Sequence, residues 1–185
     1  MFLYVERGRW MKHLESVNME VYVTRERICS ISGAEIDFLK DKVSQTERKR
    51  IRLCAHKHLE DKLHEMFIVL SKETYIRPHK HVNRIESLHV IEGRARAVFF
   101  DEMGSIIQVI PLGDLSSELQ FYCRIDEAVY HTILVDSEYF VFHESVEGPF
   151  CKSNTVFSAW APDESDCMLH QEYICNLNKA VHSFR

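Results

Sequence analysis

The chain has 185 residues, of which 45% are hydrophobic and 28% charged, a composition typical of a globular protein rather than a disordered one. Its formal net charge of −5 argues against a nucleic-acid-binding protein, since such domains are usually strongly basic. Because no apolar run reaches the roughly 20 residues that span a bilayer, we expect a cytoplasmic protein without nucleic-acid or membrane partners.

The six cysteines are scattered along the chain, and no two of them are separated by two residues. This spacing excludes a zinc ribbon and a thioredoxin-type redox pair. We therefore expect free thiols, as in a reducing compartment.

The N-terminal third is predicted to contain an extension followed by one helix. Residues 1–30 mix apolar and charged side chains without a clear period, and Met11 and Met19 offer alternative starts, so residues 1–18 are a candidate leader. A helix is predicted at about residues 33–48, where Ser32 and Glu35 form a capping box before apolar residues at helical spacing.

From about residue 64, short runs rich in Val, Ile, Phe and Tyr alternate with turn residues, which is typical of β-strands. A hairpin turn is predicted at 101–104, with Gly104 at a positive φ. A last helix is predicted at about 164–182. The predicted strands are 64–70, 75–81, 86–91, 94–101, 105–111, 119–124, 130–135 and 139–146.

Eight short strands without intervening helices predict a closed barrel or jelly roll. We divide the chain into an N-terminal extension that is partly dispensable (1–30), a helix and basic segment packing on the barrel (31–60), the barrel (61–150) and a C-terminal extension (151–185). Exposed strand edges are usually paired or covered, so we expect a homodimer through barrel edges, with the N-terminal segment crossing to or covering a sheet.

The clearest chemical pattern is RPHKHVNRIESLHVIEG, at residues 77–93. His79 and His81 are two apart in a predicted strand, so both imidazoles face the same side. Glu86 has the wrong parity for one continuous strand, and a turn at 82–84 must return its carboxylate to the same interior.

This spacing, from His79 to Gly93, matches the first motif of the cupin superfamily at every defining position. The second motif supplies one more histidine, and His131 lies where that ligand is expected, although Asp126 and Ala128 replace the usual Pro and Gly. The resemblance implies a mainly β cupin fold, a double-stranded β-helix or jelly-roll barrel with an N-terminal helix and a short C-terminal helical tail.

The resemblance also implies that His79, His81, Glu86 and His131 hold one divalent metal ion. Three neutral imidazoles and one carboxylate suit Fe, Mn, Co, Ni or Zn about equally. An octahedral ion would keep two positions open for a ligand or water.

Beyond the superfamily, the chain resembles the WbuC-type cupin metalloproteins over roughly residues 48–162. The similarity is carried by the blocks RIRLCAHKHLEDKLHEMFI, TYIRPHKH, ESLHVIEG, FFDEMGSI, VYHTIL, EGPF and SAWAP. Members of this family are commonly encoded among genes for O-antigen and other surface polysaccharides. The resemblance implies a fold and a metal site, and it does not bring a reaction.

Three further side chains are candidate contacts for a small anionic or sugar-like ligand. Arg77 and Tyr75 share the inward parity of the metal-binding histidines, and His56 follows the basic run. Arg77 would bind an anion through its guanidinium fork, while Leu88 and Ile133 supply an apolar wall. For Tyr75, core packing is the competing interpretation.

Other histidine and cysteine groups have open interpretations. The segment Cys54-Ala-His56-Lys-His58 is a second metal site, part of the pocket mouth, or a surface segment. Arg50 and Arg52 are either an anion clamp or a solvated helix end. Cys167, His170 and Cys175 provide only three of the four ligands of a structural zinc site. His89 should face away from the metal.

Two classes of function follow from these residues. The first is an enzyme of surface-polysaccharide assembly that isomerises or epimerises a sugar or nucleotide-sugar, with His56 or Tyr75 as the base. Oxygen chemistry at Fe(II) is an alternative within this class. The second class is a metal-containing binding module without turnover.

Overall fold

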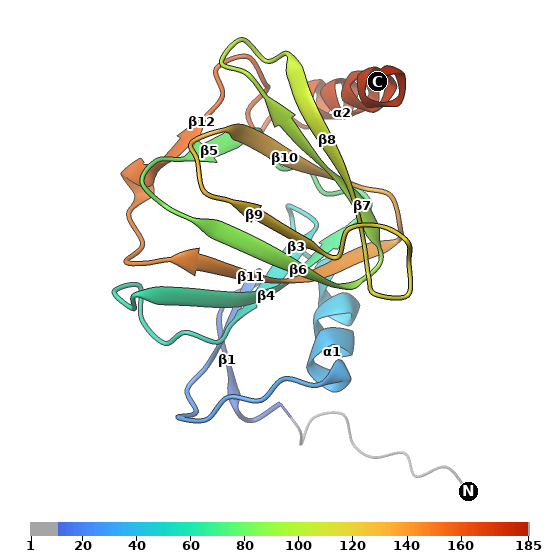
Figure 1. Cartoon of the computed structure of the whole chain (residues 1–185). Helices are drawn as coiled ribbons and strands as arrows, with labels where there is room; N and C mark the ends of the chain where they lie inside the picture. The colour runs from blue at the N-terminus through green and yellow to red at the C-terminus, as the bar shows by residue number, and fades with distance from the viewer. Residues whose placement is uncertain (1–10, 185) are drawn as a thin grey trace, which may run out of the picture.

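The computed structural model describes residues 11–184, which fold into two facing β-sheets with one long helix on the outer side of each (Figure 1). The seven-stranded sheet contains, in order, β1 (Leu14–Asn18), β2 (Val21–Thr24), β3 (Arg50–Cys54), β4 (Leu63–Ser71), β11 (Tyr139–Glu147), β6 (Glu86–Glu92) and β9 (Tyr122–Ile125). The five-stranded sheet contains β12 (Thr155–Phe157), β5 (His79–His81), β10 (Tyr130–Val135), β7 (Arg94–Phe100) and β8 (Ile106–Gly113).

The inner faces of the two sheets pack their apolar side chains together in a core. Alternate side chains of each strand point inward because side chains in a strand repeat with a period of two. Phe99 of one sheet thus packs with Phe140 and Phe142 of the other, and Leu112 is fully buried among them.

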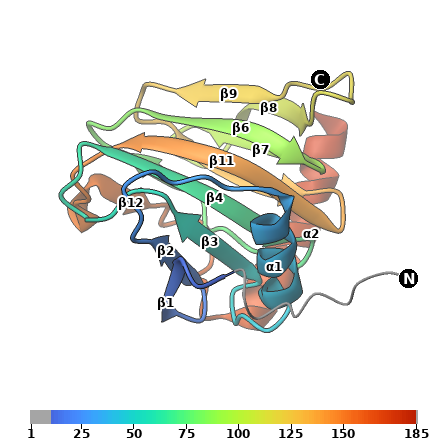
Figure 2. The same cartoon turned by 90° about the horizontal axis from the view of Figure 1, so that it is seen from below.

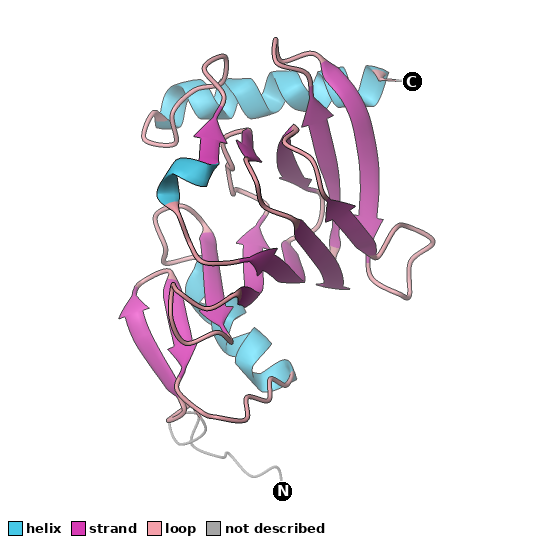
Figure 3. Ribbon diagram, turned by 60° about the vertical axis from the view of Figure 1, so that its left-hand side comes forward, coloured by secondary structure: helices cyan, strands magenta, loops and turns pink. Residues whose placement is uncertain are grey.

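The two helices cover the outer faces of the sheets. α1 (Gly33–Val43) buries Leu39 and Val43 against Ile51 and Leu53 of β3, on the outer face of the seven-stranded sheet (Figure 2). α2 (Cys167–Ser183) packs Leu177 and Val181 against the outer face of the five-stranded sheet (Figure 3). This arrangement confirms the predicted mainly β fold, with one helix on the N-terminal side of the barrel strands and one at the C-terminal end.

The first helix has the predicted start but ends earlier than expected. Ser32 and Glu35 form the capping box, with the Glu35 carboxylate accepting from the Ser32 amide at 2.8 Å. The helix ends at Val43, where the hydroxyl of Thr46 donates to the Val43 carbonyl, and Lys49 adopts a positive φ of 55°. The predicted extension to residue 48 is therefore wrong, and Arg50 begins a strand.

The structure has four strands that the sequence patterns did not predict. β1, β2 and β3 extend the larger sheet, with β2 parallel to β3, and β12 extends the smaller one. The strand predicted at 75–81 begins only at His79. Residues 1–10 of the candidate leader lie outside the described residues, whereas residues 14–18 pair with β2.

Two glycines mark tight turns of the barrel. Gly93, the last position of the metal-binding pattern, has a φ of 88°, and an added Cβ would lie 2.2 Å from the Tyr139 carbonyl oxygen. Gly104 takes the predicted positive φ, 87°, against the Trp160 ring. Only glycine adopts such a backbone at low cost beside a close neighbour, so the motif glycine has a structural reason.

Two further findings concern the cysteines and the helices. All six cysteines are free thiols. Within residues 11–184, neither helix is both long and apolar enough to cross a membrane.

We predict that the chain forms a homodimer in which barrel edges take part. β9 ends the larger sheet, and Tyr122 on this strand and the adjacent Phe121 are 44% and 40% exposed, so pairing there would cover both an open edge and aromatic surface. Sedimentation velocity at micromolar concentration should give twice the 21.8 kDa mass of the chain. A single 21.8 kDa species at that concentration would contradict this prediction.

Candidate metal centre

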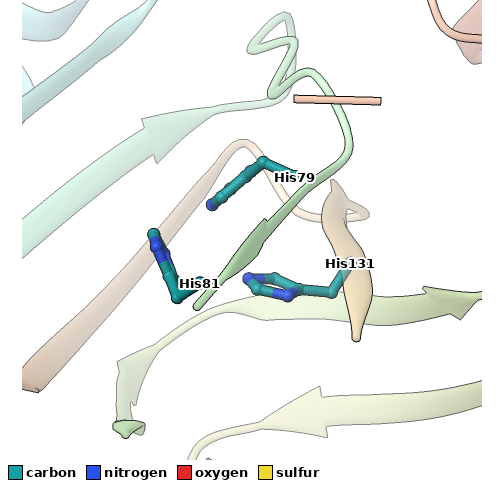
Figure 4. A group of neighbouring side chains, drawn as sticks. All are labelled: His79, His81 and His131. Carbon is teal, nitrogen blue, oxygen red and sulfur yellow. The ribbon is translucent and has the colours of Figure 1, made fainter. Parts of the chain in front are cut away.

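Three histidines from two neighbouring strands converge inside the barrel. β5 and β10 are antiparallel, and His79 lies directly opposite His131, while His81 lies two residues further along the same face. Figure 4 shows the three rings turned toward one another, and their ligand nitrogens all lie within 4.8 Å of one another. These three residues could hold a metal ion.

The carboxylate of Glu86 approaches this cluster from the other sheet. Its Oε1 lies 2.9 Å from Nε2 of His131, and its Oε2 lies 3.3 Å from Nε2 of His81. The chain crosses between the sheets in the turn after β5, where Asn83 has a positive φ of 56°. The expected change of register is thus a change of sheet, and it brings Glu86 into the same interior as His81.

Hydrogen bonds fix the tautomer of two of the three histidine rings. Nδ1 of His79 lies 3.0 Å from the Arg77 carbonyl oxygen, and Nδ1 of His131 lies 3.0 Å from the Val129 carbonyl oxygen. Because a carbonyl only accepts, both Nδ1 atoms carry the proton, and the Nε2 lone pairs remain available to a metal. Nδ1 of His81 lies 3.1 Å from the hydroxyl of Thr155 in β12.

Burial and neighbouring charge set the protonation of the site. Burial, with the adjacent histidines, lowers the pKa of His79 to about 3. Burial alone would raise the pKa of Glu86, but contacts with His131 and His81 hold it well below its usual range. Burial opposes a proton on His131, yet the Glu86 carboxylate raises its pKa overall. The cluster therefore offers an ionised carboxylate beside imidazoles, a suitable donor set for a divalent cation.

The geometry of Glu86 also fits a metal ligand. Its Oε1 is buried and makes no hydrogen bond of acceptable geometry, although His131 Nε2 is only 2.9 Å away. A buried carboxylate oxygen without a hydrogen-bond partner is costly, and a cation between the two atoms would satisfy both. The residues present thus fit one divalent ion.

The cluster opens on a cavity of about 560 Å³ between the sheets. Leu88 and Ile133 line it, as expected for its apolar wall, together with Phe99 and Phe142. Among the charged residues that line the cavity, arginines outnumber carboxylates. These charged residues are Arg25, Arg48, Arg50, Arg52, Lys57, Arg84, Glu20, Glu86, Glu144 and Glu164.

His56 lies on the cavity wall, where the sequence analysis placed a ligand contact. Its ring stacks on that of His64 with centroids 4.1 Å apart, and its Nδ1 lies 3.1 Å from the Glu65 carbonyl oxygen. Cys54 and His58 line the same cavity, so this segment forms part of its wall. Within residues 11–184, the three-histidine group is the one cluster whose ligand atoms lie close enough to share an ion.

Tyr75 and Arg77 lie outside the cavity, which corrects the inward orientation expected from parity. The Tyr75 hydroxyl donates to the Pro162 carbonyl at 2.9 Å, and the Arg77 guanidinium donates to the Ser158 carbonyl at 2.8 Å and to the Asp163 carboxylate at 2.9 Å. The parity argument fails because the strand begins only at His79. Both side chains instead hold the C-terminal segment.

The remaining histidine and cysteine candidates lie away from the cavity. His89 is exposed and stacks near the Phe121 ring, with centroids 5.6 Å apart, so it faces away from the metal centre as predicted. His170 packs near Tyr75, with ring centroids 4.9 Å apart, and both flanking cysteines are exposed.

Two charged residues of the cavity were missed by the sequence analysis. Glu144 lies on the inward face of β11, the same face as Phe142 and Val146. Arg84 lies in the turn that precedes Glu86. The sequence did contain a signal for Glu144, because this carboxylate occupies an inward position of a strand whose other inward residues are apolar. Burial, together with the nearby charge of Glu86, raises the pKa of Glu144 to about 7.

Comparison with known proteins supports the fold and leaves the activity open. A family model described as a domain of unknown function (DUF6016) matches residues 31–112, which include His79, His81 and Glu86. No curated protein sequence matches the chain.

Several solved structures align with the chain at low sequence identity. A protein from Shewanella oneidensis aligns with a TM-score of 0.55 and 10% identity, over 78% of this chain and 94% of that one. The capsular polysaccharide assembling protein CapF from Staphylococcus aureus aligns with a TM-score of 0.48 and 16% identity, over 60% of this chain and 32% of CapF. The Cnp3 cupin domain of Schizosaccharomyces pombe aligns with a TM-score of 0.42 and 9% identity, over 55% of this chain and 66% of that domain. At 10% identity, the first of these likenesses shows a shared fold alone.

Replacing a histidine of the cluster should remove most of the bound metal. We expect His79→Ala, His81→Ala and His131→Ala to lower metal content sharply, since each removes one of few ligands, and Glu86→Gln to lower it less because an amide oxygen still binds weakly. Metal per chain is measured by elemental analysis after gel filtration.

His89→Ala serves as the matched control because this histidine lies on the outer face. It should keep the wild-type metal content. Full metal content in a variant carrying both His79→Ala and His81→Ala would refute the site.

Proposed function

We propose that this chain is a metal-dependent cupin enzyme that moves a proton next to a carbonyl group of a sugar or nucleotide-sugar, as an isomerase or epimerase does. The observation that carries this proposal is one cavity that joins the three-histidine cluster to the carboxyl group of Glu144. Electrophilic stabilisation and a proton acceptor are the two components that such a reaction needs.

In this proposal His79, His81, His131 and Glu86 hold one divalent ion. When bound, the ion polarises the carbonyl of the ligand and stabilises the negative charge that develops on its oxygen. The carbonyl contacts at Nδ1 of His79 and His131 keep both rings oriented. The apolar residues Leu88 and Ile133 exclude water from one side of the cavity.

Glu144 is the residue that we assign to proton transfer. Its pKa, raised to about 7 by burial and by Glu86, allows the carboxyl group to accept and return a proton near neutral pH. It is also free of the proposed ligand set, whereas Glu86 is committed to it. His56 is a second candidate for this role, because its Nδ1 is held by the Glu65 carbonyl while its ring lines the cavity.

Glu144 favours proton transfer over the alternative of oxygen chemistry at Fe(II). A three-histidine centre would serve either reaction, but an oxygenase has no need of a carboxyl group that titrates near neutrality beside the metal. Oxygen uptake by the iron-loaded protein with a candidate sugar would favour the alternative. Binding without turnover would favour a non-catalytic module.

A role in surface-polysaccharide assembly is supported by the resemblance to WbuC-type cupins over roughly residues 48–162. Nucleotide-sugars are the activated substrates of such assembly and carry both hydroxyl-rich and anionic groups. We place this activity in the cytoplasm, which agrees with the six free thiols.

The assignment of Glu144 predicts that solvent deuterium enters the substrate in wild type and not in Glu144→Gln. A metal-loaded sample is first screened against nucleotide-sugars by thermal shift, and each binder is then incubated in deuterium oxide and followed by NMR. Because general bases contribute roughly 10²- to 10⁴-fold, we expect the exchange rate to fall by about that factor in Glu144→Gln while metal content stays unchanged.

Glu118→Gln, which changes an exposed carboxylate in a loop, is the control and should exchange at the wild-type rate. Equal exchange in Glu144→Gln and wild type would show that another group moves the proton.

A further inference from the structure

Most arginines that line the cavity are already engaged by protein oxygens. Arg50 makes a two-pronged contact with the carboxylate of Glu164, at 3.0 and 2.8 Å. Nε of Arg48 donates to Glu20 at 2.7 Å, and Nε of Arg25 donates to Glu15 at 2.7 Å. These side chains hold the wall of the cavity together and have limited capacity for a ligand.

Arg84 is largely enclosed by the protein, but its terminal nitrogens remain accessible and free of partners among the described residues. It is 8% exposed, its Nε donates to the Glu147 carbonyl at 2.8 Å, and its guanidinium lies over the Phe150 ring, 5.9 Å from the centroid. In the described part of the chain, its two terminal nitrogens have no acceptor, and Arg84 lines the cavity. A guanidinium held this firmly with free donors is suited to a bidentate anion.

Arg52 is the second cavity arginine without a carboxylate partner among the described residues, and its side chain is exposed. It lies on β3 with Cys54 and shares that residue's inward parity, opposite Ile68 of β4. Between residues 11 and 184, no carboxylate lies within ion-pair distance of it. This contrasts with Arg50, its neighbour on the same face of the strand, which is paired with Glu164.

The two arginines line the same cavity as the histidine cluster. Arg84 lies in the turn between His81 and Glu86, three residues after the first and two before the second. The positive charges of Arg52 and Arg84 and the negative charge of Glu86 all act on the carboxyl group of Glu144. One ligand could therefore reach the metal with one end and the arginines with another.

We propose that Arg84 and Arg52 form an anion-binding subsite beside the metal centre, and that the ligand of this cavity carries a carboxylate or phosphate group. The proposal rests on the proposed function, because it names the class of molecule that the metal centre would act on. Free donors on a fixed guanidinium prefer a planar or tetrahedral oxyanion to a neutral hydroxyl, since charge-assisted hydrogen bonds are about twice as strong. A sugar with such a group is favoured over a neutral sugar.

The test uses inorganic phosphate and malonate as probes in titration calorimetry with the full chain, with and without bound zinc. We expect wild type to bind at least one probe and Arg52→Gln and Arg84→Lys to bind it roughly tenfold or more weakly, the size expected for lost hydrogen bonds to a charged group. Arg84→Lys keeps the charge and removes the fork, and a thermal melt confirms that each variant is folded. Arg124→Gln, on the outer parity of β9, is the matched control and should bind like wild type.

The outcomes separate this subsite from the proposed function. Arginine-dependent binding of either probe supports the subsite, and it does so even where wild type proves to hold no metal, which would overturn the proposed function alone. Wild type that binds neither probe, or equal affinities in folded Arg52→Gln, folded Arg84→Lys and wild type, overturns the subsite. Binding that needs zinc and ignores both arginines also overturns it, because phosphate would then bind the metal directly.

Discussion

The pairing of two short strands fixes the position of the candidate metal centre. β5 is only three residues long, and its first residue, His79, stands directly opposite His131 of β10. Residues paired in this way place their side chains on the same face of the sheet, so the two imidazoles meet inside the barrel. His81 joins them because it lies two residues after His79 and therefore faces the same side of the strand. Glu86 reaches the cluster from the opposite sheet. Loss of this one pairing would separate three of the four proposed ligands.

Two contacts of the C-terminal segment stabilise this short strand. β12 pairs with β5, and its Thr155 hydroxyl contacts the ring of His81. The C-terminal segment is in turn held by Arg77, through the Ser158 carbonyl and the Asp163 carboxylate. The arginine expected to bind a ligand therefore serves the geometry of the site indirectly, by fixing the strand that orients a histidine.

The sequence was sufficient for the fold class and for the central histidines, because both depend on local patterns. The spacing of His79, His81 and Glu86 reflects the period of two in a strand followed by a turn. The pattern ends in glycine because residue 93 has a positive φ beside a close neighbour. The patterns failed where the outcome depends on distant segments. Tyr75 and Arg77 were expected to follow the strand parity, but contacts more than eighty residues away, with Pro162 and Ser158, place them elsewhere. Glu144 and Arg84 escaped notice because their importance depends on which cavity they share.

The coordination of the bound metal tests the central claim most directly. X-ray absorption at the metal edge, on protein purified without added metal, reports the number and type of ligand atoms. We expect imidazole scattering from three histidines and one carboxylate oxygen, with metal–ligand distances of about 2.0–2.2 Å if the ion is zinc. A shell made of water oxygens, or one with sulfur from the cysteines and fewer than three imidazoles, would contradict it.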